Sequence, residues 1–349
     1  MARKKPQPKP KRLKHKLNQR GLVPLGVPVH FVIQERGDET VAEQDFEQAL
    51  TAYRNARWST ASAAFTTLYQ AQQTPELNRY LAASLYHDQQ FLAAEQIAAE
   101  NDGAYLLSAE WFDLRLAIAL ANQQFIFARE LCVVPQAAAW RAAGERRIEA
   151  AEEASRTRLG ATQRVLAKQF YHLGDVSLAE QQRRLLRAHQ LPLAEFLRGT
   201  QYLLIDPFLH PLIRATLLEE LFRLRVKMVV KVQWLDDQVH SVDTAKLTGV
   251  NDNGAARIAL AYLNDQIAQD NPGLAANVRQ TLNLQLMMVY PFADKILTHP
   301  EAWVDWLAGR PIDQTVSPKV KKELVAWQSR LAGHLKTLFA AANGEKPEN

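Results

Sequence analysis

The stretch Leu81-Ala-Ala-Ser-Leu-Tyr-His-Asp-Gln-Gln-Phe-Leu-Ala-Ala-Glu-Gln96 decides the fold of this 349-residue chain. It recurs without gaps as Leu166-Ala-Lys-Gln-Phe-Tyr-His-Leu-Gly-Asp-Val-Ser-Leu-Ala-Glu-Gln181, with seven of sixteen positions identical. Apolar residues recur three and four positions apart in this part of the chain, which is the spacing of amphipathic helices. The second copy also carries a glycine, Gly174, in the turn between two expected helices. The sequence therefore predicts helices that come in similar pairs.

A shorter pattern returns at a fixed period in the same part of the chain. An aromatic residue, two variable residues and an alanine occur as Trp58-Ser-Thr-Ala61, Phe91-Leu-Ala-Ala94 and Phe125-Ile-Phe-Ala128. The three alanines recur at the period of the tetratricopeptide repeat (TPR), which is roughly 34 residues. Each such repeat is a pair of antiparallel helices. A small residue is needed where the two helices cross closely, and the aromatic ring fills the gap beside it.

The first helix of each pair and the spacing of the pairs give two further expectations. The pairs Leu81-Ala82 and Leu116-Ala117 are expected to fill matching positions on first helices, and Pro75 stands where a repeat should begin. The phase then breaks, because the interval from Ala128 to Ala179 is about one and a half repeats. Residues 137–158 are rich in Ala, Glu and Arg, and we expect one long helix there. An ordinary helical bundle with accidental self-similarity is the alternative.

We therefore predict a mainly α fold, a TPR-like alpha-alpha superhelix (solenoid) followed by a helical C-terminal region with a small β-hairpin. The hairpin is expected near residues 226–243, where two runs rich in β-branched residues flank an acidic turn. The predicted parts are a disordered basic tail (1–20), an extended strap and linker (21–44), TPR-like repeats (45–190), a helical C-terminal region (191–341) and a frayed tail (342–349).

These residues resemble a known family. The degenerate repeats, together with Leu203-Leu-Ile-Asp-Pro-Phe-Leu-His-Pro-Leu-Ile213, the β-rich segment around Trp234 and the late Tyr290-Pro-Phe292, are similar to the uncharacterised TPR repeat-containing proteins of low-GC Gram-positive bacteria (Firmicutes). The resemblance implies a bacterial interaction protein and gives no catalytic residue to transfer.

Composition limits the remaining function classes. The single cysteine, Cys132, excludes an intrachain disulfide and a Cys-rich metal site. No apolar run approaches the roughly 18–20 residues that span a bilayer, and no secretory signal is recognisable, so we expect a cytoplasmic protein. Zinc-protease, phosphate-loop, dinucleotide-binding and serine-hydrolase motifs are missing from the sequence. We predict no enzyme activity, no cofactor and no metal site.

The partner is expected to bind the concave face of the repeats, which the first helix of each pair lines. Cationic and tyrosine side chains there suit a peptide carboxylate or an acidic segment. If the Tyr-His pairs recur for packing reasons instead, they carry no binding role. The predicted groove residues are Glu76, Arg79, Tyr86, His87, Trp111, Asn122, Arg164, Lys168, Tyr171 and His172.

The basic tail is a second candidate site. Residues 1–20 hold nine Lys/Arg and no acidic residue, whereas the rest of the chain holds 33 basic and 37 acidic residues, a net charge of −4. Such a tail suits salt-sensitive phosphate contacts to RNA or the ribosome, or to an anionic membrane surface, and otherwise merely aids solubility. A peptide-sensing regulator is a third hypothesis. The tail cations are Arg3, Lys4, Lys5, Lys9, Lys11, Arg12, Lys14, Lys16 and Arg20.

Overall fold

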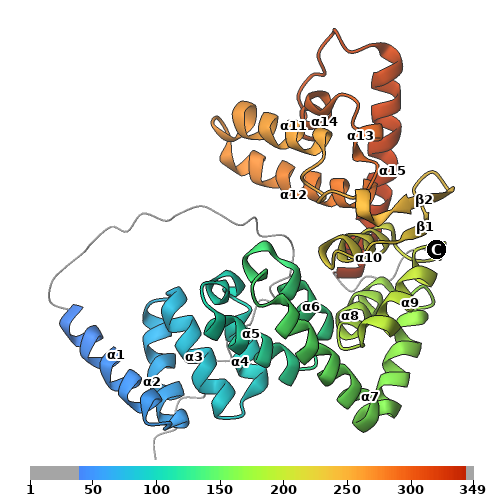
Figure 1. Cartoon of the computed structure of the whole chain (residues 1–349). Helices are drawn as coiled ribbons and strands as arrows, with labels where there is room; N and C mark the ends of the chain where they lie inside the picture. The colour runs from blue at the N-terminus through green and yellow to red at the C-terminus, as the bar shows by residue number, and fades with distance from the viewer. Residues whose placement is uncertain (1–38, 343–349) are drawn as a thin grey trace, which may run out of the picture.

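The computed structural model describes residues 39–342, which form fifteen α-helices and one two-stranded antiparallel sheet (Figure 1). The predicted tail, strap and C-terminal end fall wholly or largely outside this range. The elements are α1 (Glu39–Arg54), α2 (Trp58–Ala71), α3 (Pro75–His87), α4 (Phe91–Ala98), α5 (Ala109–Ala121), α6 (Phe125–Val133), α7 (Arg141–Tyr171), α8 (Leu178–Ala188), α9 (Leu193–Leu203), α10 (Pro211–Arg223), β1 (Val229–Gln233), β2 (Val239–Asp243), α11 (Gly254–Leu263), α12 (Pro272–Val289), α13 (Ala293–Ile296), α14 (Pro300–Leu307) and α15 (Pro318–Ala342).

The first six helices form three consecutive pairs, α1/α2, α3/α4 and α5/α6, in which each helix packs against the next. Figure 1 shows the pairs side by side in a row. The crossing alanines Ala61, Ala94 and Ala128 are completely buried, as the spacing predicted. The first helices of the second and third pairs are capped: the Thr74 hydroxyl accepts a hydrogen bond from the Leu77 amide, and the Ser108 hydroxyl accepts one from the Trp111 amide.

The turn inside each pair has the same backbone geometry three times. Ala56, Gln89 and Gln123 lie in the left-handed region, with φ of 54°, 60° and 57°, and they are separated by the same two intervals as the crossing alanines. In each turn the next amide donates back across the helix end in the Schellman arrangement. These bonds, each 2.9 Å long, run from Arg57 to Ala52, from Gln90 to Leu85 and from Gln124 to Ala119. The repeat period is therefore a property of the backbone as well as of the sequence.

Glycine should be favoured at all three turn positions. A left-handed backbone costs a residue with a Cβ about 1–2 kcal/mol, while glycine loses somewhat more entropy on folding. We expect Ala56→Gly, Gln89→Gly and Gln123→Gly each to raise the free energy of unfolding in urea by up to about 1 kcal/mol. The control Ala63→Gly, at an exposed helical position of α2, should lower it by about 1 kcal/mol. A loss of stability at the three turns like that at Ala63 would contradict their left-handed backbone.

The fourth sequence copy does not repeat this turn. Residues 141–171 form the single long helix α7, which is kinked at Leu159, where φ is −122° and ψ is 24°. Gly174 takes the place of Gln89 in the gapless alignment but has no left-handed φ. The following helix begins at Leu178, two residues later than in the other pairs, and Leu178 is buried in place of Ala179. Sequence similarity therefore continues here without the shared turn.

The predicted hairpin is present, with β1 and β2 paired from Val229 opposite Asp243 to Gln233 opposite Val239. Val230, Val232 and Val242 bury one face of the sheet in a core shared with α10 to α15. The Gln233 amide donates to the Leu204 carbonyl at 2.8 Å and so joins β1 to the end of α9.

Two boundaries differ from those expected from the sequence. Helix α1 begins at Glu39, inside the segment expected to be a linker. The core of the C-terminal part includes Leu166, Phe170 and Leu185, so it crosses the boundary expected at residue 190. The short helices α13 and α14 were not foreseen.

A charged network links the row of pairs to the rest of the molecule. Arg223 on α10 is bound to Glu130 on α6, and His189 is 2.8 Å from the Glu220 carboxylate. Burial raises the pKa of Glu130 to about 7, although the Arg223 guanidinium opposes the shift. The Ile126 amide also donates to the His189 carbonyl at 3.2 Å. The end of the row is thus fixed to α8 and α10 by polar contacts.

Candidate partner-binding faces

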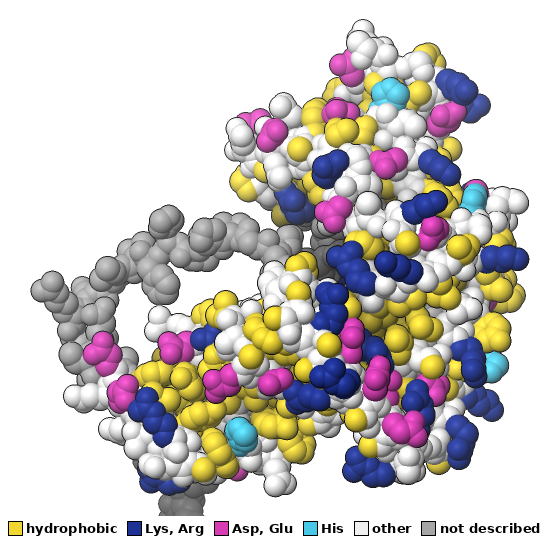
Figure 2. Space-filling view, viewed as in Figure 1, with side chains coloured by type: hydrophobic (Ala, Val, Ile, Leu, Met, Phe, Trp, Pro, Cys, Tyr) yellow, Lys and Arg dark blue, Asp and Glu magenta, His cyan; other side chains and the backbone are white. Residues whose placement is uncertain are grey.

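A row of half-buried aromatic rings crosses α1, α3 and α5. Tyr80 on α3 is at its centre, with ring centroids 6.0 Å from Phe46, 5.4 Å from Tyr53 and 5.5 Å from Trp111. All three contacts are edge-to-face, the arrangement that aromatic pairs favour. Figure 2 shows hydrophobic side chains gathered over this end of the molecule. Because these rings keep part of their surface exposed, they offer a partner rigid apolar contacts.

Three glutamates accompany the rings at the same position of successive pairs. Glu43, Glu76 and Glu110 are separated by the same intervals as the turn residues, lie near the beginnings of α1, α3 and α5, and are all exposed. None forms an ion pair with another residue of the described part of the chain. Burial, with help from the nearby Glu110 charge, raises the pKa of Tyr53. We call these three glutamates and the four rings the aromatic–acidic face.

These carboxylates also have a local role. Glu76 and Glu110 lie in the first turns of α3 and α5, where a negative charge stabilises the helix dipole by about 0.3–1 kcal/mol. This helix-dipole role accounts for an acidic residue near a helix start. It does not account for the row of aromatic rings beside the three glutamates. The whole segment is acidic, since residues 39–140 hold 12 Asp/Glu and five Arg, a net charge of −7.

Arg79, a predicted groove cation, is engaged in internal contacts. Its guanidinium lies over the Trp111 ring, 5.1 Å from the centroid, and donates to the Ala104 carbonyl at 3.3 Å. The structure therefore brings Arg79 and Trp111 together, next to Glu76 on the same face. The Arg79 side chain therefore packs between α3 and α5, and its charge is engaged in these internal contacts.

Tyr86 and His87 lie near the turn end of α3. The His87 ring stacks on Trp58 at 4.3 Å, and Tyr86 contacts Phe91 at 5.5 Å. Burial lowers the pKa of His87. These two predicted groove residues therefore pack between neighbouring turns. A packing role for the Tyr-His pair was one of the two alternatives that the sequence left open.

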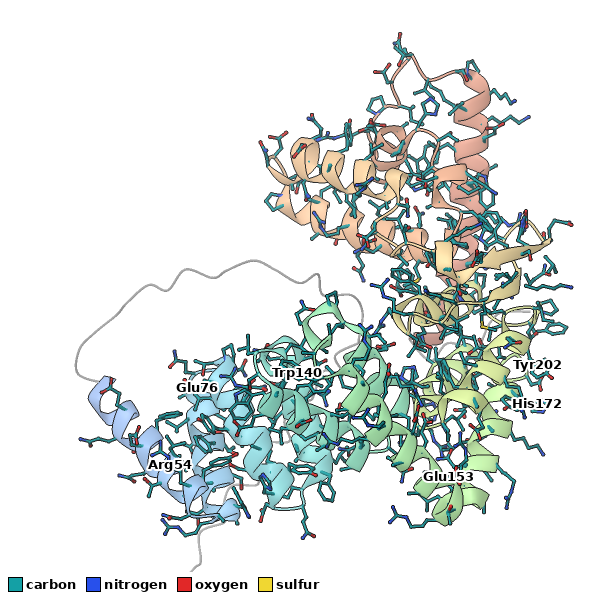
Figure 3. The ribbon with its side chains drawn as sticks, viewed as in Figure 1. Arg54, Glu76, Trp140, Glu153, His172 and Tyr202 are labelled. Atoms are coloured by element: carbon teal, nitrogen blue, oxygen red, sulfur yellow. The ribbon has the colours of Figure 1, made fainter. Side chains whose placement is uncertain are left out.

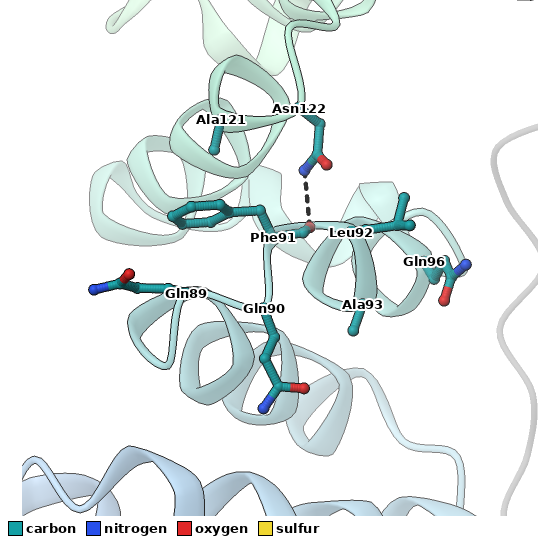
Figure 4. A pocket seen from close by; sticks show the side chains of 8 residues that line it. All are labelled: Gln89, Gln90, Phe91, Leu92, Ala93, Gln96, Ala121 and Asn122. Carbon is teal, nitrogen blue, oxygen red and sulfur yellow. Dashed lines mark hydrogen bonds between the residues drawn. The ribbon is translucent and has the colours of Figure 1, made fainter.

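Asn122 also stabilises a turn. Its side-chain amide donates to the carbonyls of Phe91 at 2.8 Å and Ile118 at 2.9 Å (Figure 4). It borders an open depression of about 570 Å³ on the turn side of α3 to α5. The lining residues are Gln89, Gln90, Phe91, Leu92, Ala93, Gln96, Ala121 and Asn122.

The remaining predicted groove residues lie elsewhere. Arg164, Lys168, Tyr171 and His172 belong to α7 and the loop after it. Figure 3 shows His172 at the opposite side of the molecule from Glu76, with the intervening helices between them. The ten residues therefore form two separate groups. His172 is 2.8 Å from Asp175, and both side chains are exposed.

One sequence equivalence is shifted by one residue. The step that carries the turn residue Gln89 onto Gln123 carries Leu81 onto Arg115, and not onto Leu116. Arg115 is completely buried and donates to both oxygens of Glu95, at 2.7 and 3.1 Å, and to Asp102 at 2.7 Å. Burial alone would lower the pKa of Arg115, but Asp102 and Glu95 outweigh it and raise the pKa. Arg115 and its ion cluster thus stand where α3 buries Leu81 and where the first pair has the exposed Gln48.

No known protein family matches the chain, and neither does a curated protein or a solved structure. Within residues 39–342 no three His, Cys, Asp or Glu side chains are grouped to hold a metal ion. No helix in that range is both long enough and apolar enough to span a bilayer. The predicted tail cations lie outside the described residues.

Sequence reasoning missed five residues of the aromatic–acidic face: Phe46, Tyr53, Tyr80, Glu43 and Glu110. The signal for the glutamates was present, because the repeat period carries Glu76 directly onto Glu43 and Glu110. The rings gave a weaker signal, since apolar spacing alone does not separate a core aromatic from a half-exposed one.

Proposed function

We propose that this chain is a binding scaffold whose aromatic–acidic face holds an extended peptide segment carrying Lys or Arg. One observation carries the proposal: three exposed carboxylates repeat at the helix-pair period beside a continuous row of half-buried rings. Carboxylates bind ammonium and guanidinium groups through charge-assisted hydrogen bonds. Aromatic faces add cation–π attraction.

The spacing suggests the form of the peptide. Packed helices are about 8–10 Å apart, and a chain in the extended polyproline II conformation advances about 3.1 Å per residue with three residues per turn, so every third side chain points to the same side. Carboxylates on successive first helices would then meet every third residue of the peptide. We therefore expect the bound segment to repeat Lys or Arg with two residues between them.

The partner that this face suits is basic, whereas the sequence predicted an acidic one. The sequence favoured an acidic segment because Arg79, Arg164 and Lys168 were placed in one groove. Arg79 is occupied by Trp111 and Ala104, and the two α7 cations lie elsewhere. Arg79 is half-buried, so the exposed charges of this face, among the described residues, are those of its three glutamates.

We also propose assignments of the superhelix type, the family resemblance, the location and the kind of activity. We assign the three pairs to a TPR-like superhelix, supported by the three matching turns. We also keep the resemblance to the TPR proteins of low-GC Gram-positive bacteria, a cytoplasmic location, and a role in binding without catalysis. RNA or ribosome binding through residues 1–20 stays a separate hypothesis, as does a peptide-sensing regulator.

A random-peptide display selection on the immobilised full chain tests the proposal. We expect enriched peptides to carry Lys or Arg at every third position, and we expect the enrichment to disappear on the variant Glu43→Gln/Glu76→Gln/Glu110→Gln. The matched control Glu149→Gln changes an exposed glutamate of α7 and should leave the enrichment intact. Enrichment of Asp- or Glu-rich peptides, or none at all, would contradict the proposal.

A further inference from the structure

The end of the molecule built from α7, α8 and α9 has the opposite charge. Residues 156–198 hold eight Lys/Arg and three Asp/Glu. All three acids have a side-chain partner: Asp175 contacts His172, Glu180 pairs with Arg183 and Arg184, and Glu195 pairs with Arg156. Five exposed cations form no ion pair within 4 Å among the described residues, although the charges of Arg187 and Arg198 act on the nearby Glu180 and Glu195; these cations are Arg158, Arg164, Lys168, Arg187 and Arg198. Figure 2 shows Lys and Arg gathered over this end.

Three of these cations lie on two adjoining helix stripes. On α7, Arg164, Lys168 and Tyr171 are separated by four and three residues, so they share one side of the helix. On α9, Arg198 and Tyr202 are four residues apart and share a side in the same way. The stripes therefore run along neighbouring helices.

The two helices touch where these stripes meet. The Tyr171 hydroxyl donates to the Glu195 carbonyl at 3.2 Å, and the Tyr171 and Tyr202 rings are 6.3 Å apart. A Cβ at Gly199 would lie 2.5 Å from Phe170 and 2.6 Å from Tyr171, so only glycine permits this approach. Figure 3 shows Tyr202 beside His172 at this edge of the molecule. The two stripes form one continuous ledge.

Exposed rings stand among the cations. Tyr202 is 61 % exposed, and Phe208 in the loop after α9 is 78 % exposed. Phe208 lies in the Leu203–Ile213 segment, which is one of the segments that carry the family resemblance. Its backbone amide donates to Asp206 at 2.9 Å, and a Cβ at Gly174 would clash with the Asp206 carboxylate, so this loop packs against the residues that follow α7.

We propose that this ledge, formed by Arg164, Lys168 and Arg198 with Tyr202 and Phe208, binds single-stranded RNA. The cations contact successive phosphates, and the two rings stack on bases. Proteins that bind single strands combine a positive track with aromatic platforms in this way. The site is distinct from the basic tail and from the aromatic–acidic face.

Two other polyanionic partners fit the ledge less well. An acidic peptide offers no planar base for the exposed rings. A membrane-binding helix separates an apolar side from a charged side, whereas α9 places Arg198 and Tyr202 on the same side, one turn apart. Alternation of cation and ring matches the alternation of phosphate and base along a strand.

Fluorescence anisotropy of the full chain with a fluorescein-labelled 20-nucleotide RNA of mixed sequence tests the proposal. We expect Arg164→Glu/Lys168→Glu/Arg198→Glu to weaken binding at least tenfold. It should also reduce the slope of log affinity against log salt by about 2, because each phosphate contact on a single strand contributes about 0.7. Tyr202→Ala should weaken binding about tenfold, and Tyr202→Phe, which keeps the ring, should not.

The charge control is Arg257→Glu/Lys322→Glu/Lys336→Glu, three exposed cations of the C-terminal part, which should bind RNA like the unaltered chain. Binding that is the same in the ledge variant and in this control would assign the RNA to other cations and overturn the proposal. Equal loss for Tyr202→Phe and Tyr202→Ala would also overturn it. The proposal would also be overturned if vesicles with one-third phosphatidylserine, or poly-glutamate, displaced the RNA by binding to the same three cations.

Discussion

Replacing Arg115 with methionine should lower the free energy of unfolding by about 3–5 kcal/mol. The Arg115 side chain is completely buried and the Glu95 side chain is 5 % exposed. Methionine would leave the Glu95 carboxylate buried without its two guanidinium hydrogen bonds. It would also remove the bond to Asp102 and the contact with the Phe127 ring. Urea unfolding followed by circular dichroism measures the loss.

Two companion variants make this prediction specific. The pair Arg147–Asp113 joins the neighbouring helices α7 and α5 at 2.8 Å but is largely exposed, so Arg147→Ala should cost less than about 1 kcal/mol. The double variant Arg115→Met/Glu95→Met should recover much of the single variant's loss, because it removes both buried charges. A cost below about 1 kcal/mol for Arg115→Met alone, like that of an exposed pair, would show that the cluster does not stabilise the row of helix pairs.

Reversing two charges on the aromatic–acidic face should abolish peptide binding. For a selected Lys- or Arg-repeating peptide, we expect Glu76→Lys/Glu110→Lys to weaken affinity at least 100-fold, since each change replaces an attraction with a repulsion of roughly 1–2 kcal/mol at this exposed surface. Glu76→Gln/Glu110→Gln should have a smaller effect. Isothermal titration at two salt concentrations measures both.

The stability of these variants separates binding from folding. At the starts of α3 and α5, losing the dipole interaction costs at most about 1 kcal/mol per site, and reversing it with lysine costs at most about 2 kcal/mol per site, so both variants should stay folded. The variant Glu149→Lys/Glu301→Lys changes exposed residues of α7 and α14. It serves as a charge-matched control and should bind nearly as well as the unaltered chain. If the control weakens affinity as strongly as the face variant, net charge and not this face would explain the binding.

Much of the row of helix pairs was predictable because one local rule repeats. The aromatic-x-x-alanine spacing located the crossing alanines Ala61, Ala94 and Ala128, and all three are buried. The long helix near residues 137–158 and the hairpin near 226–243 were also anticipated. In each case the determining signal lies within a short window of sequence.

Features that depend on distant contacts were not predictable. Arg115 stands in an apolar helix, and only the fold brings Glu95 and Asp102 to it. The core that joins Leu166 and Phe170 to the C-terminal helices likewise depends on tertiary packing. Very short helices such as α13 have too few residues to show a period.

The candidate site was partly predictable for the same reasons. The sequence placed ten residues in one groove because it assumed that the fourth copy continued the stack. The kink at Leu159 and the missing left-handed turn at Gly174 end that regularity. The set therefore divides into three groups: Glu76, Arg79 and Trp111 lie on or beside the aromatic–acidic face, Tyr86, His87 and Asn122 pack at the turns, and the last four residues lie on α7 and the loop after it.

Site-specific photo-crosslinking tests the central claim most directly. A benzophenone amino acid replaces Tyr80 in one full-length variant and Tyr202 in another, and each is irradiated with a Lys- or Arg-repeating peptide obtained from the selection. We expect an adduct from position 80 that the Glu76→Lys/Glu110→Lys changes remove, with little adduct from position 202. An adduct from position 202 and none from position 80 would contradict the aromatic–acidic face as the peptide site.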